Sequence, residues 1–291
     1  MQNFIQQVMN GLVLGSVYAL IALGLTMIYG VLGLINWAHG EVYMVGAFVG
    51  YILAVRMGLH YFVALVGAML IMAVFGIVVE RVVFLPLRGR PNMNVIIGTL
   101  GLSVFLLDGA NLTMGPDPVR FPSIYTDQFI RILGISFTVQ RLLVVVVTLV
   151  LIAVLRLFIK NHKLGKAMRA CSQDLQAASL MGIEINHVAM ITAAIAASLA
   201  AAAGTLIGPI FLVNPQMSIA AVGKAFAVTI LGGLGNVEGA VVAGFTLGLA
   251  ESLTVAYISS YLKEIVAFAI LITTLILNPE GIFGKHSVEK V

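Results

Sequence analysis

Ionisable side chains are rare in the apolar parts of this chain, so those that occur there are the first candidates for chemistry. Lys224 and Glu251 fall inside two consecutive apolar stretches, and Asn36, His39 and Glu41 lie at the break after the first stretch. A charge in hydrocarbon is costly, and such residues usually pair with one another or line a pathway for solutes. We therefore expect Lys224 and Glu251 to form either a structural ion pair or part of a gate.

The polar residues at the first break have two interpretations. Asn36, His39 and Glu41 either cap and satisfy the start of the next helix, which is the simpler interpretation, or belong to a translocation path. Catalysis is the least favoured possibility. Ser16 and His39 have the residue types of a nucleophile and a base, but a serine in a glycine-rich apolar helix is usually a packing residue.

Several kinds of site are excluded by the sequence. No HExxH motif or Cys/His cluster predicts a metal site, and the single cysteine, Cys171, excludes an internal disulfide. The nearest approach to a phosphate-binding loop, GIFGKHS at 281–287, has the wrong glycine spacing and a histidine in the Ser/Thr position. We therefore expect no cofactor, and any ATP hydrolysis must be carried out by another chain.

The composition is that of an all-α polytopic membrane protein. Of 291 residues, 60% are hydrophobic and only 10% are charged, whereas a soluble domain has about 25% charged residues. Residues 1–40 and 185–223 contain no Asp, Glu, Lys or Arg. The net charge of +4 does not predict a nucleic-acid partner, because basic residues collect at the cytoplasmic edges of membrane proteins.

Hydropathy and helix breakers predict about nine membrane segments in one transmembrane domain, 1–291. The predicted segments are 9–30, 41–57, 61–84, 93–113, 138–159, 187–210, 218–234, 237–258 and 262–278. The two predicted segments within 9–57 are closely joined, and so are the two within 218–258. One member of each pair could be re-entrant, and one re-entrant segment would leave eight membrane-spanning segments. Small residues at 193–204 and glycines in the first segment predict closely packed helices.

The basic residues predict the orientation. Ten of the sixteen lie on one side of this arrangement: Arg81, Arg88, Arg90, Arg156, Lys160, Lys163, Lys166, Arg169, Lys285 and Lys290. This side is cytoplasmic by the positive-inside rule, so the N-terminus is expected outside and the C-terminus inside.

A polar segment, 160–186, interrupts the apolar stretches on the cytoplasmic side. Written on one helix, Lys166, Arg169 and Gln173 share a face, and Ala167 and Cys171 share the opposite one. An amphipathic helix in water next to a membrane packs against lipid, its own bundle or a soluble partner. Lipid is the least favoured, because the small apolar face is a weak anchor.

Four motifs in order along the chain resemble the permeases of branched-chain amino acid ABC importers. They are NGLVLGSVYALIALGLTMIYGVLGLINWAHGEVYMVGA (10–47), GKAMRACSQDLQAASLMGI (165–183), KAFAVTILGGLGNVEGA (224–240) and NPEGIFGKHSVEKV (278–291). The resemblance covers essentially the whole chain. It implies an ABC importer permease fold in a bacterial inner membrane, a related second permease subunit, two separate ATPase subunits and an extracytoplasmic amino-acid-binding protein.

The resemblance also implies that 160–186 is the cytoplasmic coupling segment. By matching positions, the candidates for the ATPase contact are Arg169, Ala170, Asp174, Ala177, Ala178 and Gly182. Arg169 and Asp174 would make charge-assisted hydrogen bonds, the alanines would allow close approach, and Gly182 would end the helix in a left-handed conformation. Two alternatives stay open: a secondary transporter of a small neutral solute, and an ABC permease for urea or amides.

Overall fold

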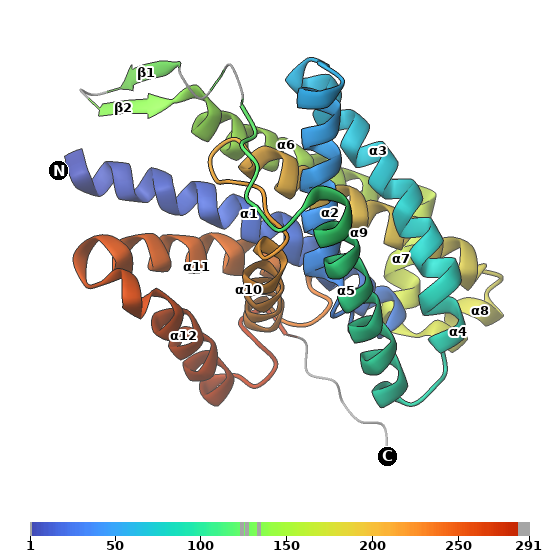
Figure 1. Cartoon of the computed structure of the whole chain (residues 1–291). Helices are drawn as coiled ribbons and strands as arrows, with labels where there is room; N and C mark the ends of the chain where they lie inside the picture. The colour runs from blue at the N-terminus through green and yellow to red at the C-terminus, as the bar shows by residue number, and fades with distance from the viewer. Residues whose placement is uncertain (1, 123–124, 126–127, 133–134, 285–291) are drawn as a thin grey trace.

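Every predicted membrane segment is helical in the computed structural model, which describes residues 2–122, 125, 128–132 and 135–284 (Figure 1). The elements in chain order are α1 (Gln2–Leu32), α2 (His39–Tyr51), η1 (Ile52–Arg56), α3 (Tyr61–Val79), η2 (Glu80–Phe84), α4 (Leu85–Leu87), α5 (Asn92–Met114), β1 (Phe129–Ile132), β2 (Ile135–Thr138), α6 (Val139–Asn161), α7 (Lys163–Gln173), α8 (Leu175–Leu180), α9 (Ile185–Ile207), α10 (Met217–Gly232), α11 (Val237–Tyr257), η3 (Ser260–Leu262) and α12 (Lys263–Leu277). Lys285, Lys290 and the end of the last motif lie outside the described residues.

Seven helices in the described part of the chain are long and apolar enough to cross a membrane, which makes the chain a multi-pass membrane protein. They span Asn3–Leu32, Tyr61–Leu87, Asn92–Met114, Val139–Asn161, Ile185–Ile207, Val237–Tyr257 and Ser260–Leu277. The two remaining predicted segments are the continuous helix formed by α2 and η1, and α10, which has 16 residues. Nine crossings therefore stay a prediction.

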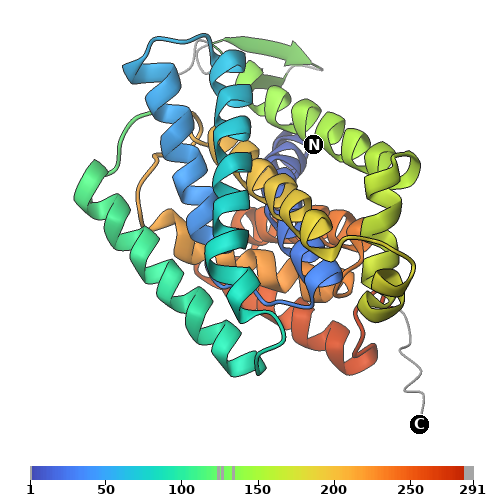
Figure 2. The same ribbon diagram turned by 90° about the vertical axis from the view of Figure 1, so that its right-hand side faces the viewer.

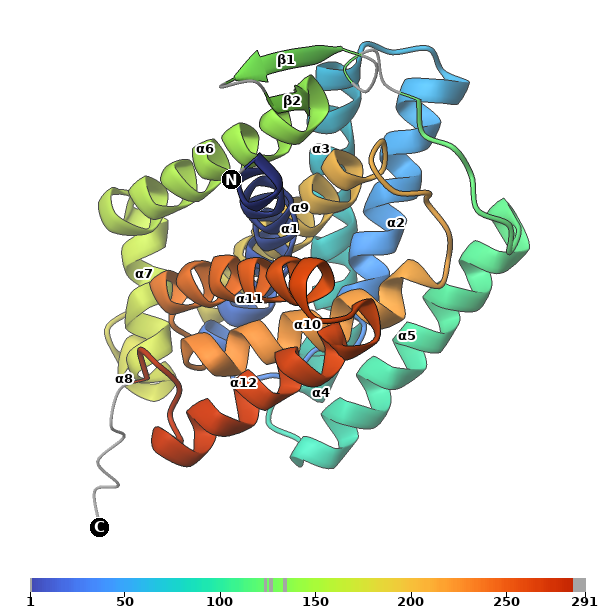
Figure 3. The ribbon, with the colours of Figure 1, turned by 90° about the vertical axis from the view of Figure 1, so that its left-hand side faces the viewer.

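The helices connect at two opposite sides of the bundle. The N-terminal end of α1, the antiparallel β1–β2 hairpin and the α2–α3 connection lie on one side, while α7, α8 and the α4–α5 connection lie on the other (Figures 1 and 3). On the hairpin side, Val119 and Val213 pair as an isolated β-bridge that joins the loops after α5 and α9. The basic residues before and within α7 lie on the opposite side, as the positive-inside prediction requires.

Helix α1 lies at the centre of the bundle and packs against α6, α9, α10 and α11. Small residues make this close approach possible. A Cβ added at Gly15 would lie 2.8 Å from the Cα of Phe245, and one added at Gly244 would lie 2.8 Å from the Cα of Ala19. In lipid, where apolar burial gives little preference for helix–helix contact, such backbone proximity is a main source of packing energy.

Replacing Gly15 by leucine should therefore prevent correct packing of α1 against α11. The larger side chain would overlap backbone as well as side-chain atoms, and overpacking of this kind costs about 1–3 kcal/mol or more. Gly101→Leu is the matched control, because a Cβ at Gly101 meets no atom within 4 Å. Fluorescence-detected size-exclusion chromatography of membrane extracts should show a monodisperse control and a lost or aggregated Gly15→Leu peak. Equal yields would contradict the packing described here.

The loops at 33–36 and 233–236 have similar sequences and share two features, a glycine with positive φ after the preceding helix and an asparagine that accepts a backbone hydrogen bond before the next one. Gly33 and Gly233 have positive φ angles of 66° and 98° after the ends of α1 and α10. Asn36 Oδ1 then accepts a hydrogen bond from the Ala38 amide, and Asn236 Oδ1 accepts one from the Gly239 amide, both at 3.0 Å. The glycines thus serve turns and close packing.

Candidate functional site

The coupling segment is two short helices rather than one. Helix α7 ends at Gln173 and α8 begins at Leu175, and Asp174 between them has an extended backbone with φ −160° and ψ 112°. The Asp174 side chain accepts a hydrogen bond from the Ala177 amide at 2.9 Å and so caps α8. The single amphipathic helix expected from the sequence is therefore broken at an N-cap residue, and the residues after Asp174 face a different direction.

The end of α8 has the left-handed glycine expected at Gly182. Its φ is +81°, and the Gly182 amide donates to the Ser179 carbonyl at 3.0 Å while the Ile183 amide donates to the Ala178 carbonyl at 3.1 Å. These two hydrogen bonds define a Schellman motif. The cap holds the turn after α8 in a fixed conformation.

The inner face of the segment packs on the bundle. Met168, Cys171 and Ala178 are buried in the main hydrophobic core, and α7 contacts α1, α6 and α9. Burial raises the pKa of the Cys171 thiol and so lowers its reactivity at neutral pH. A displacement of α7 would therefore be transmitted directly to three helices of the bundle.

The six predicted contact residues divide between the two faces. Arg169, Asp174, Ala177 and Gly182 are exposed, Ala170 is half-buried and Ala178 is 4% exposed. The Arg169 guanidinium is within 3.4 Å of the Lys160 carbonyl oxygen. Ala178 packs against the protein's own core, so it supports the segment from behind and does not lie on the exposed face.

Two exposed apolar side chains at the end of the segment were not among the residues predicted from the sequence. Leu180 is 88% exposed and Met181 is 83% exposed, although both lie outside the membrane-spanning helices. We call Leu180 and Met181 the apolar tip. Large apolar side chains this exposed in water indicate an interaction surface when they are adjacent and rimmed by polar residues. Their signal in the sequence was the Leu-Met-Gly run directly after the amphipathic pattern.

Lys224 and Glu251 form an ion pair inside the bundle, with 2.5 Å between Nζ and Oε1. The Lys224 Nζ also lies 2.6 Å from Oε2 of Glu264 and 5.7 Å from the ring centroid of Phe268, and Tyr18 donates its hydroxyl hydrogen to Glu251 Oε2 at 2.8 Å. We call Tyr18, Lys224, Glu251 and Glu264 the charged cluster. It connects α1, α10, α11 and α12.

The charged cluster is buried except on one side. Lys224 and Glu251 are 5% and 3% exposed, whereas half of the Glu264 side chain is exposed. The sequence predicted the pairing of Lys224 with Glu251 but not Glu264, which begins the last apolar segment, or Tyr18, which carries no recognisable signal. One ammonium between two carboxylates is suited to holding the helices of the cluster together. Glu264 is the member whose side chain is half exposed and therefore least constrained by packing.

The polar residues at the first break do not form a catalytic arrangement. The His39 Nε2–H donates to the Ile21 carbonyl at 3.1 Å, because a carbonyl only accepts, and Ser16 donates to the Leu12 carbonyl at 2.7 Å. Asn36 is used in the turn before α2, and Glu41 is 3% exposed in the first turn of α2. Ser16 and His39 thus each donate a hydrogen bond to a different backbone carbonyl rather than to one another. No group of three or more His, Cys, Asp or Glu residues that could hold a metal ion occurs in the described residues.

Comparison with known proteins agrees with this architecture. Residues 7–275 match the family described as branched-chain amino acid transport system / permease component. The chain is 40% identical to the high-affinity branched-chain amino acid transport system permease protein LivH of Escherichia coli K12, covering 99% of this chain and 98% of that protein. It is 37% identical to BraD of Pseudomonas aeruginosa, with the same coverage. It is also 25% identical to LivM of Escherichia coli K12, over 91% of this chain and 67% of LivM. The chain belongs to the branched-chain amino acid transport system permease family.

Proposed function

We propose that this chain is one of two permease subunits of an ATP-driven ABC importer for branched-chain amino acids in a bacterial inner membrane. The names of the relatives support this substrate class. The similarity to LivM, another permease of the same kind of system, supports a related second subunit rather than a second copy of this chain. The permease itself catalyses no reaction, and ATP hydrolysis belongs to separate subunits.

The proposed topology has nine crossings, with the N-terminus outside and the C-terminus inside. Its support is that the connections alternate between two sides of the bundle (Figure 3), with the basic residues around α7 on the inner one. Helix α10, at 16 residues, would reach about 24 Å at 1.5 Å per residue. This is slightly short of a hydrocarbon core of about 30 Å.

The ATPase is proposed to dock on α7 and α8. The single observation that carries this assignment is the apolar tip, which directly precedes the Gly182 cap and is exposed on the side of the bundle that the proposed topology places inside. Arg169, Asp174 and Ala177 in the same segment are also exposed, so the segment offers charged groups that can fix its orientation besides the apolar anchor. Asp174 retains one carboxylate oxygen for the ATPase after capping α8.

Transport would then follow from movement of the coupling segment. ATP binding brings the two ATPases together, and each displaces the α7–α8 unit docked on it. Because α7 packs on α1, α6 and α9, its displacement tilts the bundle and opens the pathway to the outside. An extracytoplasmic binding protein releases its amino acid into the pathway, and hydrolysis resets the bundle. A pathway with few charges suits a zwitterionic solute with an apolar side chain.

Uptake of labelled leucine tests this function. Cells that express the chain together with the second permease, ATPase and binding-protein subunits of its importer should accumulate leucine, and excess isoleucine or valine should compete while urea should not. Deletion of the ATPase genes should abolish uptake. Uptake that persists without the ATPases would support a secondary transporter, and competition by urea alone would support an amide permease.

A further inference from the structure

Glu41 is buried in the bundle, and no described residue pairs with its carboxylate. The residue is 3% exposed, and its Oε2 oxygen is enclosed without a hydrogen-bond partner among the described residues. The ion pairs in the described part of the chain join Arg88 to Glu80, Arg156 to Glu238, and Lys224 to Glu251 and Glu264. A buried carboxylate without a partner is unfavourable, so a ligand that brings a positive charge would be bound there.

Glu41 does not cap its own helix. It is the third residue of α2, the position from which a glutamate can reach back to the amide of the N-cap residue. That N-cap residue is Ala38, and its amide already donates to Asn36 Oδ1 at 3.0 Å. The capping interpretation of the polar residues at the first break therefore fits Asn36 and does not account for Glu41.

The Glu41 side chain lies on the face of α2 that is turned away from α9. A Cβ added at Gly50 would lie 2.4 Å from Oγ1 of Thr205, so Gly50 marks the face that packs on α9. Glu41 precedes Gly50 by nine residues, which is about two and a half helical turns, and therefore lies on the opposite face. Val45 and Phe48 follow on the same face as Glu41, about one and two turns later.

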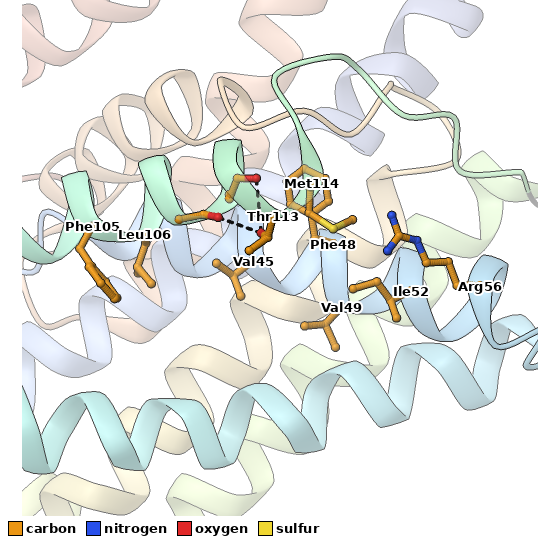
Figure 4. A pocket seen from close by; sticks show the side chains of 11 residues that line it. Val45, Phe48, Val49, Ile52, Arg56, Phe105, Leu106, Thr113 and Met114 are labelled. Carbon is orange, nitrogen blue, oxygen red and sulfur yellow. Dashed lines mark hydrogen bonds between the residues drawn. The ribbon is translucent and has the colours of Figure 1, made fainter.

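This face of α2 lines a groove between α2–η1 and α5, the helix beside it at the edge of the bundle (Figure 2). The groove has a volume of about 520 Å³, and its lining includes Val45, Phe48 and Arg56. Figure 4 shows these side chains in a row, with Arg56 at one end. Glu41 is one turn beyond Val45 in the other direction, toward the inner side of the proposed topology. The row thus begins with a carboxylate, continues with apolar side chains and ends with a guanidinium.

An aromatic pair lies at the same end of α2 as Glu41. Trp37 directly precedes the N-cap residue and is 38% exposed, and its ring centroid is 4.6 Å from that of Phe226 on α10. Helix α10 also approaches the first turn of α2, since a Cβ added at Gly40 would lie 2.4 Å from the Ser218 carbonyl oxygen. The inner end of α2 therefore combines an unpartnered carboxylate with an aromatic surface.

From this juxtaposition we infer that Glu41 binds the ammonium group of the transported amino acid, while Trp37 and Phe226 contact its apolar side chain. The inference rests on the proposed function and names the residues that meet the substrate. An ammonium on a buried carboxylate makes charge-assisted hydrogen bonds. A metal ion would need several oxygen ligands, and no group of three or more His, Cys, Asp or Glu residues that could hold one occurs in the described residues.

The site holds the amino acid by one charge only. Arg56 is 15 residues from Glu41, which corresponds to about 20 Å along a helix. The two side chains therefore cannot bind the same molecule of a small amino acid. A single ion pair and an apolar contact suit a site from which the solute must also be released.

Glu41→Gln tests the inference in the complete importer, reconstituted in vesicles with leucine-loaded binding protein. The variant should reduce the maximal rate of leucine uptake at least tenfold, whereas Glu41→Asp, which retains a carboxylate, should keep at least a third of it. Glu238→Gln is the matched control, because Glu238 lies in the first turn of α11 with an exposed side chain, and its uptake should stay within twofold of the parent. Since Glu41 has no partner among the described residues, Glu41→Gln should lower neither the thermal midpoint in detergent nor the stimulation of ATP hydrolysis by the binding protein.

Contact with the substrate is measured on the parent with a diazirine analogue of leucine as the probe. Illumination during turnover, followed by peptide mass spectrometry, should place adducts within residues 37–45 and 222–230. Excess leucine should remove these adducts, and Glu41→Gln should reduce them at least fivefold. Adducts confined to other segments, or uptake by Glu41→Gln equal to that of the parent, would overturn the inference alone. A parent that imports no leucine would overturn the proposed function and this inference with it.

Discussion

Replacing Leu180 and Met181 together by aspartate should reduce leucine uptake at least tenfold without preventing insertion of the permease. Burial of each large apolar side chain in a partner contributes about 1.5–3 kcal/mol, so loss of both corresponds to more than a hundredfold weaker docking. The tip makes no contribution to the permease's own core, because both side chains are more than four-fifths exposed. Uptake, ATPase retention on the purified permease and permease yield should be measured on the same preparations.

The control for this variant retains the apolar character of the tip. Leu180→Met with Met181→Leu exchanges the two residue types and should leave uptake and ATPase retention within about twofold of the parent. Asp174→Lys and Arg169→Glu test the polar part of the same surface and should lower the coupling of hydrolysis to uptake. Unchanged uptake in the aspartate double variant would show that the apolar tip is not part of the ATPase contact.

The second large effect is expected at Lys224. Replacement by methionine leaves Glu251, which is 3% exposed, as an uncompensated buried charge beside Glu264. Removal of one partner of a buried ion pair costs about 3–5 kcal/mol. Lys224→Met should therefore strongly reduce the amount of folded permease in the membrane, measured by size-exclusion chromatography of detergent extracts.

A double variant separates the structural role of the charged cluster from a role in gating. Lys224→Met with Glu251→Gln removes the buried carboxylate and leaves an amide that can still accept the hydrogen bond from Tyr18, so most of the folded protein should return. If uptake returns together with the folded protein, the ion pair has a structural role only. If the double variant assembles fully but does not transport, the cluster takes part in gating. Failure of the double variant to restore folding would contradict the ion-pair account.

The sequence predicted those features that depend on local composition. Apolar stretches predicted where the helices lie, and the left-handed cap at Gly182 was expected from the match of 165–183 to the family motif, which has a glycine at that position. The pairing of Lys224 with Glu251 was also predictable, because adjacent spans run antiparallel and a buried charge needs a partner.

One local feature and several that depend on contacts between distant segments were missed. The break at Asp174 arises because the aspartate side chain caps a new helix instead of allowing the first helix to continue. A prediction that places the whole segment on one helix cannot anticipate this break. Ala178 was expected at the ATPase contact, yet its burial depends on how the segment packs on the bundle. Tyr18 enters the charged cluster from a helix more than 200 residues away in sequence.

The central claim, that α7 and α8 meet an ATPase rather than lipid, can be measured directly. A photoreactive amino acid placed at position 180 of the full chain should, in the assembled complex, form its main adduct with an ATPase subunit. The same residue at position 112, where Leu112 is 87% exposed on a spanning helix, should not do so. Adducts from position 180 that contain only phospholipid, with no ATPase in the assembled complex, would contradict the account.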